Sequence, residues 1–154
     1  MFTGISSTIC QQAWAILTPA IEKAAHDGVI NGLRGSILVI NPHSDTDEIL
    51  FLGHVGEEDP QYLVNIKAKA AVTLRTGIDS SRVRQEFPHL YQAGDIVWPG
   101  AINRDGLVVA YSGVQGEFDE MIAEWMVSAI RAISRDLMLR PGGAAEAESP
   151  YLEG

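Results

Sequence analysis

The sequence predicts an α+β domain in which helices pack on an antiparallel sheet of about five strands. Apolar residues recur at helical spacing in three long segments, which indicates helices with one buried face. Between these segments lie two pairs of short apolar runs, each pair joined by a turn-rich connection that is typical of a hairpin. Because a hairpin pairs its strands antiparallel, the expected order is α-β-β-α-β-β-α, a profilin-like arrangement.

The composition indicates one globular domain, residues 1–140, followed by a flexible acidic tail, residues 141–154. The chain has 154 residues, of which 46% are hydrophobic, enough for a single core. Its formal net charge of −9 argues against nucleic acid or an anionic membrane surface as a partner. We expect a soluble, cytoplasmic protein, because no apolar run is long enough to span a bilayer and the N-terminus lacks a basic n-region.

The first helix is expected to begin at Thr8, where Gln11 completes a capping box, and to end at Asp27-Gly28. Pro19 lies inside this helix and is expected to kink or divide it, since proline lacks the N–H of a helical hydrogen bond. The β-branched run at 35–40 and the apolar run at 49–52 then form the first hairpin, with a long acidic connection.

The second helix starts near the acidic residues before Pro60 and runs to about Leu74. Its apolar face consists of Leu63, Ile66, Ala70 and Leu74. Lys67 lies at the edge of this face, whereas Lys69 is predicted to point well away from it. A lysine at such an edge either extends to water or reaches a ligand in a cleft.

A polar connection, residues 77–94, contains a short helix that begins at Ser80 or Ser81 and that Pro88 interrupts. Strands at 95–98 and 107–112 form the second hairpin. Its turn lies around Asp105-Gly106, two residues that tolerate positive φ. The last helix follows Gly116 and buries a stripe made of Ile122, Met126, Ala129, Ile130, Ile133 and Leu137.

The sequence contains no strong catalytic or metal-binding motif, and no metal is predicted. His26 and His43 lie in predicted turns and are expected to be solvated. His54 follows a strand and His89 lies in the long connection, so either could face a pocket as a haem ligand or a proton carrier. A phosphate site after Gly113 is not favoured, because acidic residues already occupy the first turn of the last helix.

The basic residues are unevenly distributed. Five of the eleven lie in one short segment, at Lys67, Lys69, Arg75, Arg82 and Arg84, and acidic residues crowd the segment before it. Two interpretations remain open. The segment forms a solvated face with salt bridges, or it provides a basic site for carboxylates such as haem propionates or a small dicarboxylic acid.

Five stretches of the C-terminal half resemble the GlcG/HbpS-like family of small haem-binding and PduO C-terminal-like domains. These stretches are KAKAAVTLRTGIDSS (67–81), WPGAI (98–102), RDG (104–106), VVAYSGVQG (108–116) and DEMIAE (119–124). Either Lys67 or Lys69 takes the position of the family lysine, and Ser80 matches the Thr or Ser that follows it. The chain departs from the family pattern at Trp98 and Tyr111, which are bulky where the family has small residues.

The resemblance implies a small-molecule-binding domain, with haem or another tetrapyrrole as the ligand. Lys67, Lys69 and Arg75 would then meet the propionates, Trp98 and Tyr111 would pack against the ring, and His54 or His89 would ligate iron. Ser80 is a further expected ligand-binding residue. It also implies a homo-oligomer. A further interpretation is that the chain is a scaffold or oligomerisation unit without any chemical activity.

The alternative function is a small catabolic enzyme, such as a hydrolase, deaminase or isomerase, that acts on a carboxylated metabolite by acid–base catalysis. In that interpretation Lys67 or Lys69 binds the carboxylate, and His54, His89 or Asp95 transfers the proton. The bulk of Trp98 and Tyr111 favours a smaller pocket than that of the family.

Overall fold

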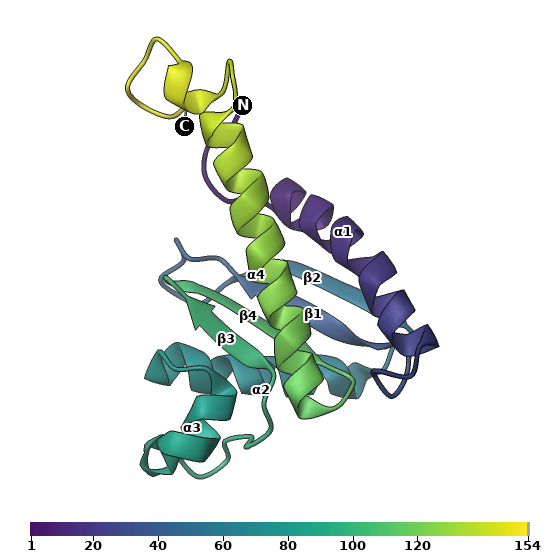
Figure 1. Ribbon diagram of the computed structural model, residues 1–154. Helices are drawn as coiled ribbons and strands as arrows, with labels where there is room; N and C mark the ends of the chain where they lie inside the picture. Colours follow the sequence, from purple (N-terminus) through teal and green to yellow (C-terminus); the bar gives the residue numbers. More distant parts are fainter. Residues whose placement is uncertain (154) are drawn as a thin grey trace.

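A four-stranded antiparallel sheet in the order β2-β1-β4-β3 forms the centre of the computed structural model, which describes residues 1–153 (Figure 1). The strands are β1 (Arg34–Ile40), β2 (Ile49–Gly56), β3 (Ala101–Arg104) and β4 (Leu107–Ser112). The predicted α+β class and the element order are confirmed. The expected number of about five strands is slightly too high, and residues 95–98, expected to be a strand, have no regular structure.

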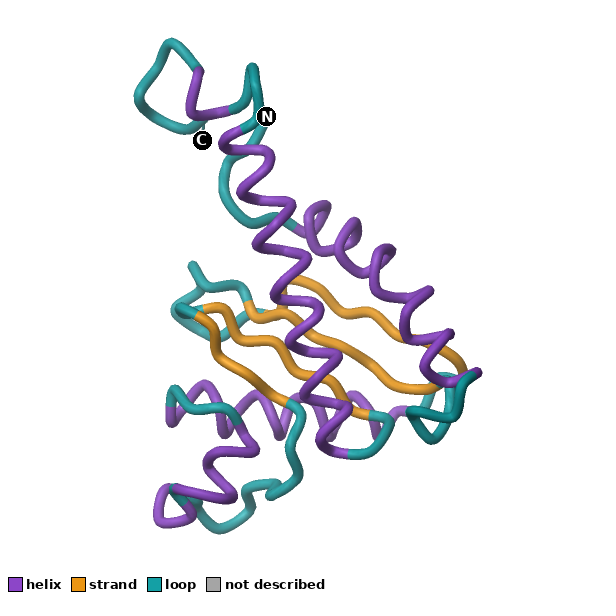
Figure 2. Tube along the Cα trace, in the orientation of Figure 1, coloured by secondary structure: helices purple, strands orange, loops and turns teal. Residues whose placement is uncertain are grey.

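Helices cover both faces of the sheet (Figures 1 and 2). One face is covered by α1 (Ser7–His26) and α4 (Gly116–Leu139), and the other by α2 (Pro60–Thr76), beside which lies α3 (Ser80–Glu86). Because successive side chains of a strand point to opposite faces, Ile37 of β1 packs with α1 and α4 and Leu38 packs with α2. The central strands are therefore buried on both sides.

The two hairpins have the predicted connections. β1 and β2 pair from Arg34↔Gly56 to Ile40↔Ile49, with a register shift next to Ile40. The turn between β3 and β4 places Asp105 at φ 53° and Gly106 at φ 90°, the pair of positive values that the sequence predicted. β1 and β4 then pair in the middle of the sheet and bring Ser36 opposite Ser112.

The start of α1 and the effect of its proline differ from the prediction. The helix cap is Ser6, whose side chain accepts a hydrogen bond from the N–H of Ile9, so Thr8 lies inside the first turn. Pro19 does not divide the helix. Leu17 and Ile21 are buried on either side of it, and their packing holds both parts of the helix on the sheet.

The remaining helices follow the sequence closely. Asp59 caps α2 by accepting from the N–H of Gln61, and Pro60 is its first residue. After α3, a short 3₁₀ helix (Pro88–Leu90) begins at the predicted interruption. Within residues 1–153, none of the helices has the length and apolar character that crossing a bilayer requires. The flexibility of the tail after residue 140 stays a prediction.

Candidate functional site

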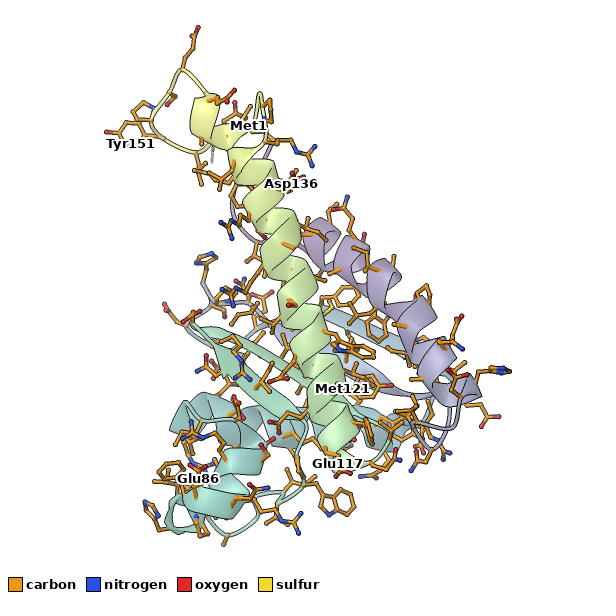
Figure 3. All side chains as sticks on the ribbon, in the orientation of Figure 1. Met1, Glu86, Glu117, Met121, Asp136 and Tyr151 are labelled. Carbon is orange, nitrogen blue, oxygen red and sulfur yellow. The ribbon has the colours of Figure 1, made fainter. Side chains whose placement is uncertain are left out.

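A cleft of about 430 Å³ opens between α2, the segment 98–99 and the loop that joins β4 to α4. Its volume lies within the range of sites that bind small molecules. Tyr62 and Asn65 of α2 line it, as do Arg84 of α3, Trp98 and Val114. The first turn of α4, marked by Glu117 in Figure 3, completes the rim. We call this site the Lys69 cleft, because Lys69 lines it from the buried side.

Lys69 is buried between α2 and the end of β4, with 1% of its surface exposed. Its Nζ donates to Asp119 Oδ2 at 2.8 Å and to the backbone oxygen of Tyr111 at 3.2 Å. The prediction that Lys69 points away from the buried side of the helix is wrong. The buried face of α2 is turned relative to the expected one and consists of Ile66, Lys69, Ala70, Val72 and Thr73.

Asp119 is the ion-pair partner that offsets part of the free-energy cost of burying the Lys69 ammonium. It lies near the start of α4, is 2% exposed, and accepts from the N–H of Val114 at 2.9 Å through Oδ1. Burial raises the pKa of Asp119 to about 6, an effect that Lys69 only partly offsets. Burial likewise lowers the pKa of Lys69, against the attraction of Asp119. The Lys69 ammonium and the Asp119 carboxylate therefore lie in a desolvated environment at the base of an open cleft.

The Lys69 ammonium has one donor left. An ammonium group carries three N–H donors, and Asp119 and the oxygen of Tyr111 use two of them. Within residues 1–153 the structure gives the third donor no acceptor. An oxygen atom in the cleft, from a ligand or a water molecule, can accept this third hydrogen bond.

Gly100 follows the lining residues Trp98 and Pro99 and packs directly against the lysine. A Cβ at this position would lie 2.8 Å from Lys69 Nζ and 2.4 Å from the backbone oxygen of Tyr111. The backbone of Gly100 has φ 145°, which residues with a side chain rarely adopt. The WPGAI stretch therefore positions the wall by close backbone approach, next to Trp98, of which 57% is exposed.

Ser80 supports this wall from behind rather than lining the cleft. Its Oγ accepts from the N–H groups of Gly100 and Ala101, both at 2.9 Å, and donates to the oxygen of Ala101 at 3.1 Å. One hydroxyl thus fixes the segment that leads from the cleft wall into β3.

Replacing Ser80 with alanine is expected to lower the free energy of unfolding by about 2 kcal/mol, because two buried N–H groups lose their acceptor. Chemical denaturation measures this loss. The exposed Ser7→Ala variant, at the first residue of α1, is the control and should change stability by less than about 0.5 kcal/mol. Equal stability of the two variants would contradict the supporting role of Ser80.

Arg75 and Asp95 form a second support, for the connection before the cleft wall. The guanidinium of Arg75 donates to both oxygens of Asp95, at 3.1 and 2.5 Å, and to the oxygen of Leu90 at 3.2 Å. Hydrogen bonds from Arg75 and from the N–H of Gln92 hold the pKa of Asp95 below its usual value. This pairing suits a structural carboxylate better than a proton acceptor.

The other predicted site residues lie elsewhere. Lys67 is exposed and borders a separate hollow between α2 and β1. His54 lies within β2, 3.4 Å from Glu58, and His89 is exposed with its ring edge-on to Phe87. The ring of Tyr111 is in the core on the opposite face of the sheet, where its hydroxyl donates to the oxygen of Arg34 at 2.6 Å.

The structure therefore brings Lys69, Trp98 and the backbone of Tyr111 together, and separates them from His54 and His89. Sequence reasoning missed Asp119 as a partner of the lysine, although the residue belongs to the DEMIAE stretch. It also missed Tyr62 and Asn65, whose positions carried no signal in the sequence, and Ser112, which belongs to the VVAYSGVQG stretch. Within residues 1–153, no group of three or more His, Cys, Asp or Glu is placed to hold a metal ion.

Comparisons with known proteins identify the fold. No family model and no curated protein match the chain. Protein ORFY of Klebsiella pneumoniae, described with the family DUF336, aligns with a TM-score of 0.62 and 16% identity over 83% of this chain and 91% of that one. HbpS aligns with a TM-score of 0.56 and 18% identity over 83% and 91%.

A structure described as the PduOC–haem complex aligns with a TM-score of 0.56 and 17% identity over 82% of this chain and 95% of that one. The chain thus has the fold of the GlcG/HbpS-like proteins, as the sequence stretches predicted. Identities this low establish the fold and leave the ligand to be argued from the site.

Proposed function

We propose that this protein binds a small, flat organic acid in the Lys69 cleft. The observation that carries the proposal is the buried ammonium with an unused N–H at the base of an open, partly aromatic cleft. A carboxylate or carbonyl oxygen of the ligand would accept this third hydrogen bond. It would thereby remove the cost of an unsatisfied buried donor.

Two further side chains support an acidic, flat ligand. Arg84 lines the cleft and forms no ion pair within residues 1–153, so its guanidinium is available to a carboxylate at the rim. Trp98 exposes 57% of its surface and offers a flat apolar face to a ring. Glu117 and Asp119 limit the negative charge that the cleft accepts, which favours a monoacid over a phosphate.

Haem is the ligand of one protein with this fold, but the donors of the cleft do not suit a histidine-bound haem. Its lining contains no His, Cys or Met, and Tyr62 is the one side chain of a type that ligates haem iron. His54 and His89 lie outside the cleft. We therefore expect no Soret shift that depends on either histidine when haemin is added.

Acid–base catalysis on a carboxylated metabolite has weaker support. Asp119 has the raised pKa that a proton carrier needs, but Lys69 and backbone N–H groups occupy both of its oxygens. Asp95 is held by Arg75, and neither histidine reaches the cleft. Binding without turnover is the function that this geometry favours.

Benzoate is a suitable first probe, with titration calorimetry as the readout. We expect Arg84→Gln to weaken benzoate binding about tenfold, the value of one charge-assisted hydrogen bond. Arg82→Gln is the matched control on the same helix, because Arg82 already pairs with Glu86 outside the cleft. Equal affinity in the two variants, or no binding by the wild type, would reject the proposal.

A further inference from the structure

The C-terminal half of α4 projects beyond the sheet (Figures 1 and 3). Its side chains form one wall of a second hollow. This groove measures about 1020 Å³, and the connection between β1 and β2, the β3–β4 turn and Ile5 form its other walls. α4 contributes a stripe at helical spacing, which consists of Ser128, Arg131, Ala132, Arg135 and Leu139. We call this hollow the α4 groove.

The charges of the α4 groove are not balanced within the chain. Arg131 and Arg135 lie one turn apart, are exposed, and form no ion pair within residues 1–153. Arg140 also lines the groove and pairs with Asp136, while Asp105 and His43 face it from the two loops. Three arginines thus face two aspartates in a chain of net charge −9. Two like charges one turn apart destabilise a helix unless an anion lies between them.

The groove also offers apolar surface. Leu139 is 58% exposed at its end, and Ile5 borders the opposite wall. An occupant that combines carboxylates with large apolar side chains would therefore satisfy both kinds of surface.

The C-terminal tail of the chain has this chemistry. From residue 141 to residue 153 it carries three glutamates, at 146, 148 and 153, and no lysine or arginine. Tyr151 is 82% exposed and Leu152 is 47% exposed, so the two have little packing of their own. The side chains that line the α4 groove come from residues up to Arg140, so within the described chain the tail does not fill its own groove.

We propose that the α4 groove binds the tail segment Glu148–Glu153 of a second copy of this chain. The carboxylate of Glu148 would lie between Arg131 and Arg135, and Tyr151 and Leu152, three and four residues further along the tail, would cover Leu139 and Ile5. An extended segment of this length reaches about 17 Å, and the helix from Arg131 to Leu139 rises about 12 Å, so the segment spans the stripe. Exchange of tails between two copies buries the same surface twice, as a twofold dimer requires.

A charge-swap experiment on the full chain tests this dimer. The first variant, Arg131→Glu/Arg135→Glu, reverses the groove, and the second, Glu148→Lys/Glu153→Lys, reverses the tail. Each variant alone presents like charges at both contacts, so each is expected to be a monomer by light scattering after gel filtration. In an equimolar mixture, one contact joins the two reversed partners and the other joins the two natural ones. The mixture is therefore expected to restore the dimer.

Arg82→Glu/Arg84→Glu is the matched control, since it reverses two arginines on α3, outside the groove, and should leave the dimer intact. Circular dichroism melts show whether each variant is folded. The proposal is overturned if the wild type is a monomer. It is also overturned if the reversed variants remain dimers, or if mixing them restores nothing although both are folded.

Discussion

Replacing Lys69 with methionine is expected to lower the free energy of unfolding by about 3–5 kcal/mol, the loss that follows when one partner of a buried ion pair is removed. Methionine fills a similar volume, so the loss is electrostatic in origin. The substitution removes the cation that pairs with the Asp119 carboxylate, and Asp119 is only 2% exposed, so water cannot replace that cation. It also removes the hydrogen bond to the oxygen of Tyr111, which joins α2 to the end of β4.

Lys67→Met provides the matched control, because Lys67 is an exposed lysine two positions earlier on the same helix. We expect it to change the free energy of unfolding by less than about 0.5 kcal/mol in urea denaturation. If the two variants lose the same stability, the pair between Lys69 and Asp119 does not matter to the fold.

The double variant Lys69→Met/Asp119→Asn separates the charge from the packing. It has no uncompensated ion, and the asparagine oxygen can still accept from the N–H of Val114. We therefore expect it to be more stable than Lys69→Met alone, with a coupling energy of about 2 kcal/mol between the two positions. Additive losses would show that the two side chains act independently, contrary to their 2.8 Å contact.

Much of the fold could be predicted because its signals are local. The Asp105-Gly106 turn depends on two neighbouring residues and is present. Of the apolar stripe predicted for α4, Ile122, Met126 and Ile130 are buried, whereas Ala129, Ile133 and Leu137 are only partly buried. The predicted strand at 95–98 fails for a non-local reason. Arg75 and Ser80 hold the chain on either side of it through Asp95 and Gly100, and β3 pairs with β4 only from Ala101 onward.

The site was harder to predict, because its central contact joins residues fifty positions apart. Periodicity treats a lysine as a residue that seeks water, so it placed Lys69 away from the buried face of α2. Lys69 is buried because the tertiary fold places Asp119 of α4 beside it, and this ion pair outweighs the tendency of a lysine to remain solvated. Trp98 was predicted from its departure from a family pattern, and it does line the cleft. Arg84 appeared in the basic segment without any signal that separated it from Arg82.

The last large effect concerns Gly113, where β4 ends and the loop to α4 begins. Its backbone has φ 154° and passes directly against β1. A Cβ at this position would lie 2.3 Å from Gly35 Cα and 2.7 Å from the backbone oxygen of Arg34. Neither contact can be relieved by rotating a side chain, so the strand or the loop must move.

Gly113→Ala is therefore expected to lower the free energy of unfolding by more than about 4 kcal/mol, as a change that forces backbone atoms apart. Gly106→Ala is the control, since Gly106 also has positive φ but a Cβ there would meet nothing within 4 Å. It should cost only about 1–2 kcal/mol, the conformational penalty alone. Urea denaturation of both variants separates the two causes, and equal losses would mean that the contact with β1 is not limiting.

The same substitution connects the fold to the cleft. Displacing Gly113 moves the N–H of Val114, to which Asp119 is hydrogen-bonded, and Asp119 in turn holds Lys69. We therefore expect any folded fraction of Gly113→Ala to bind benzoate more weakly than Gly106→Ala, in which this chain of contacts is intact. Unchanged benzoate affinity in a folded Gly113→Ala protein would show that the loop before α4 does not position the lysine.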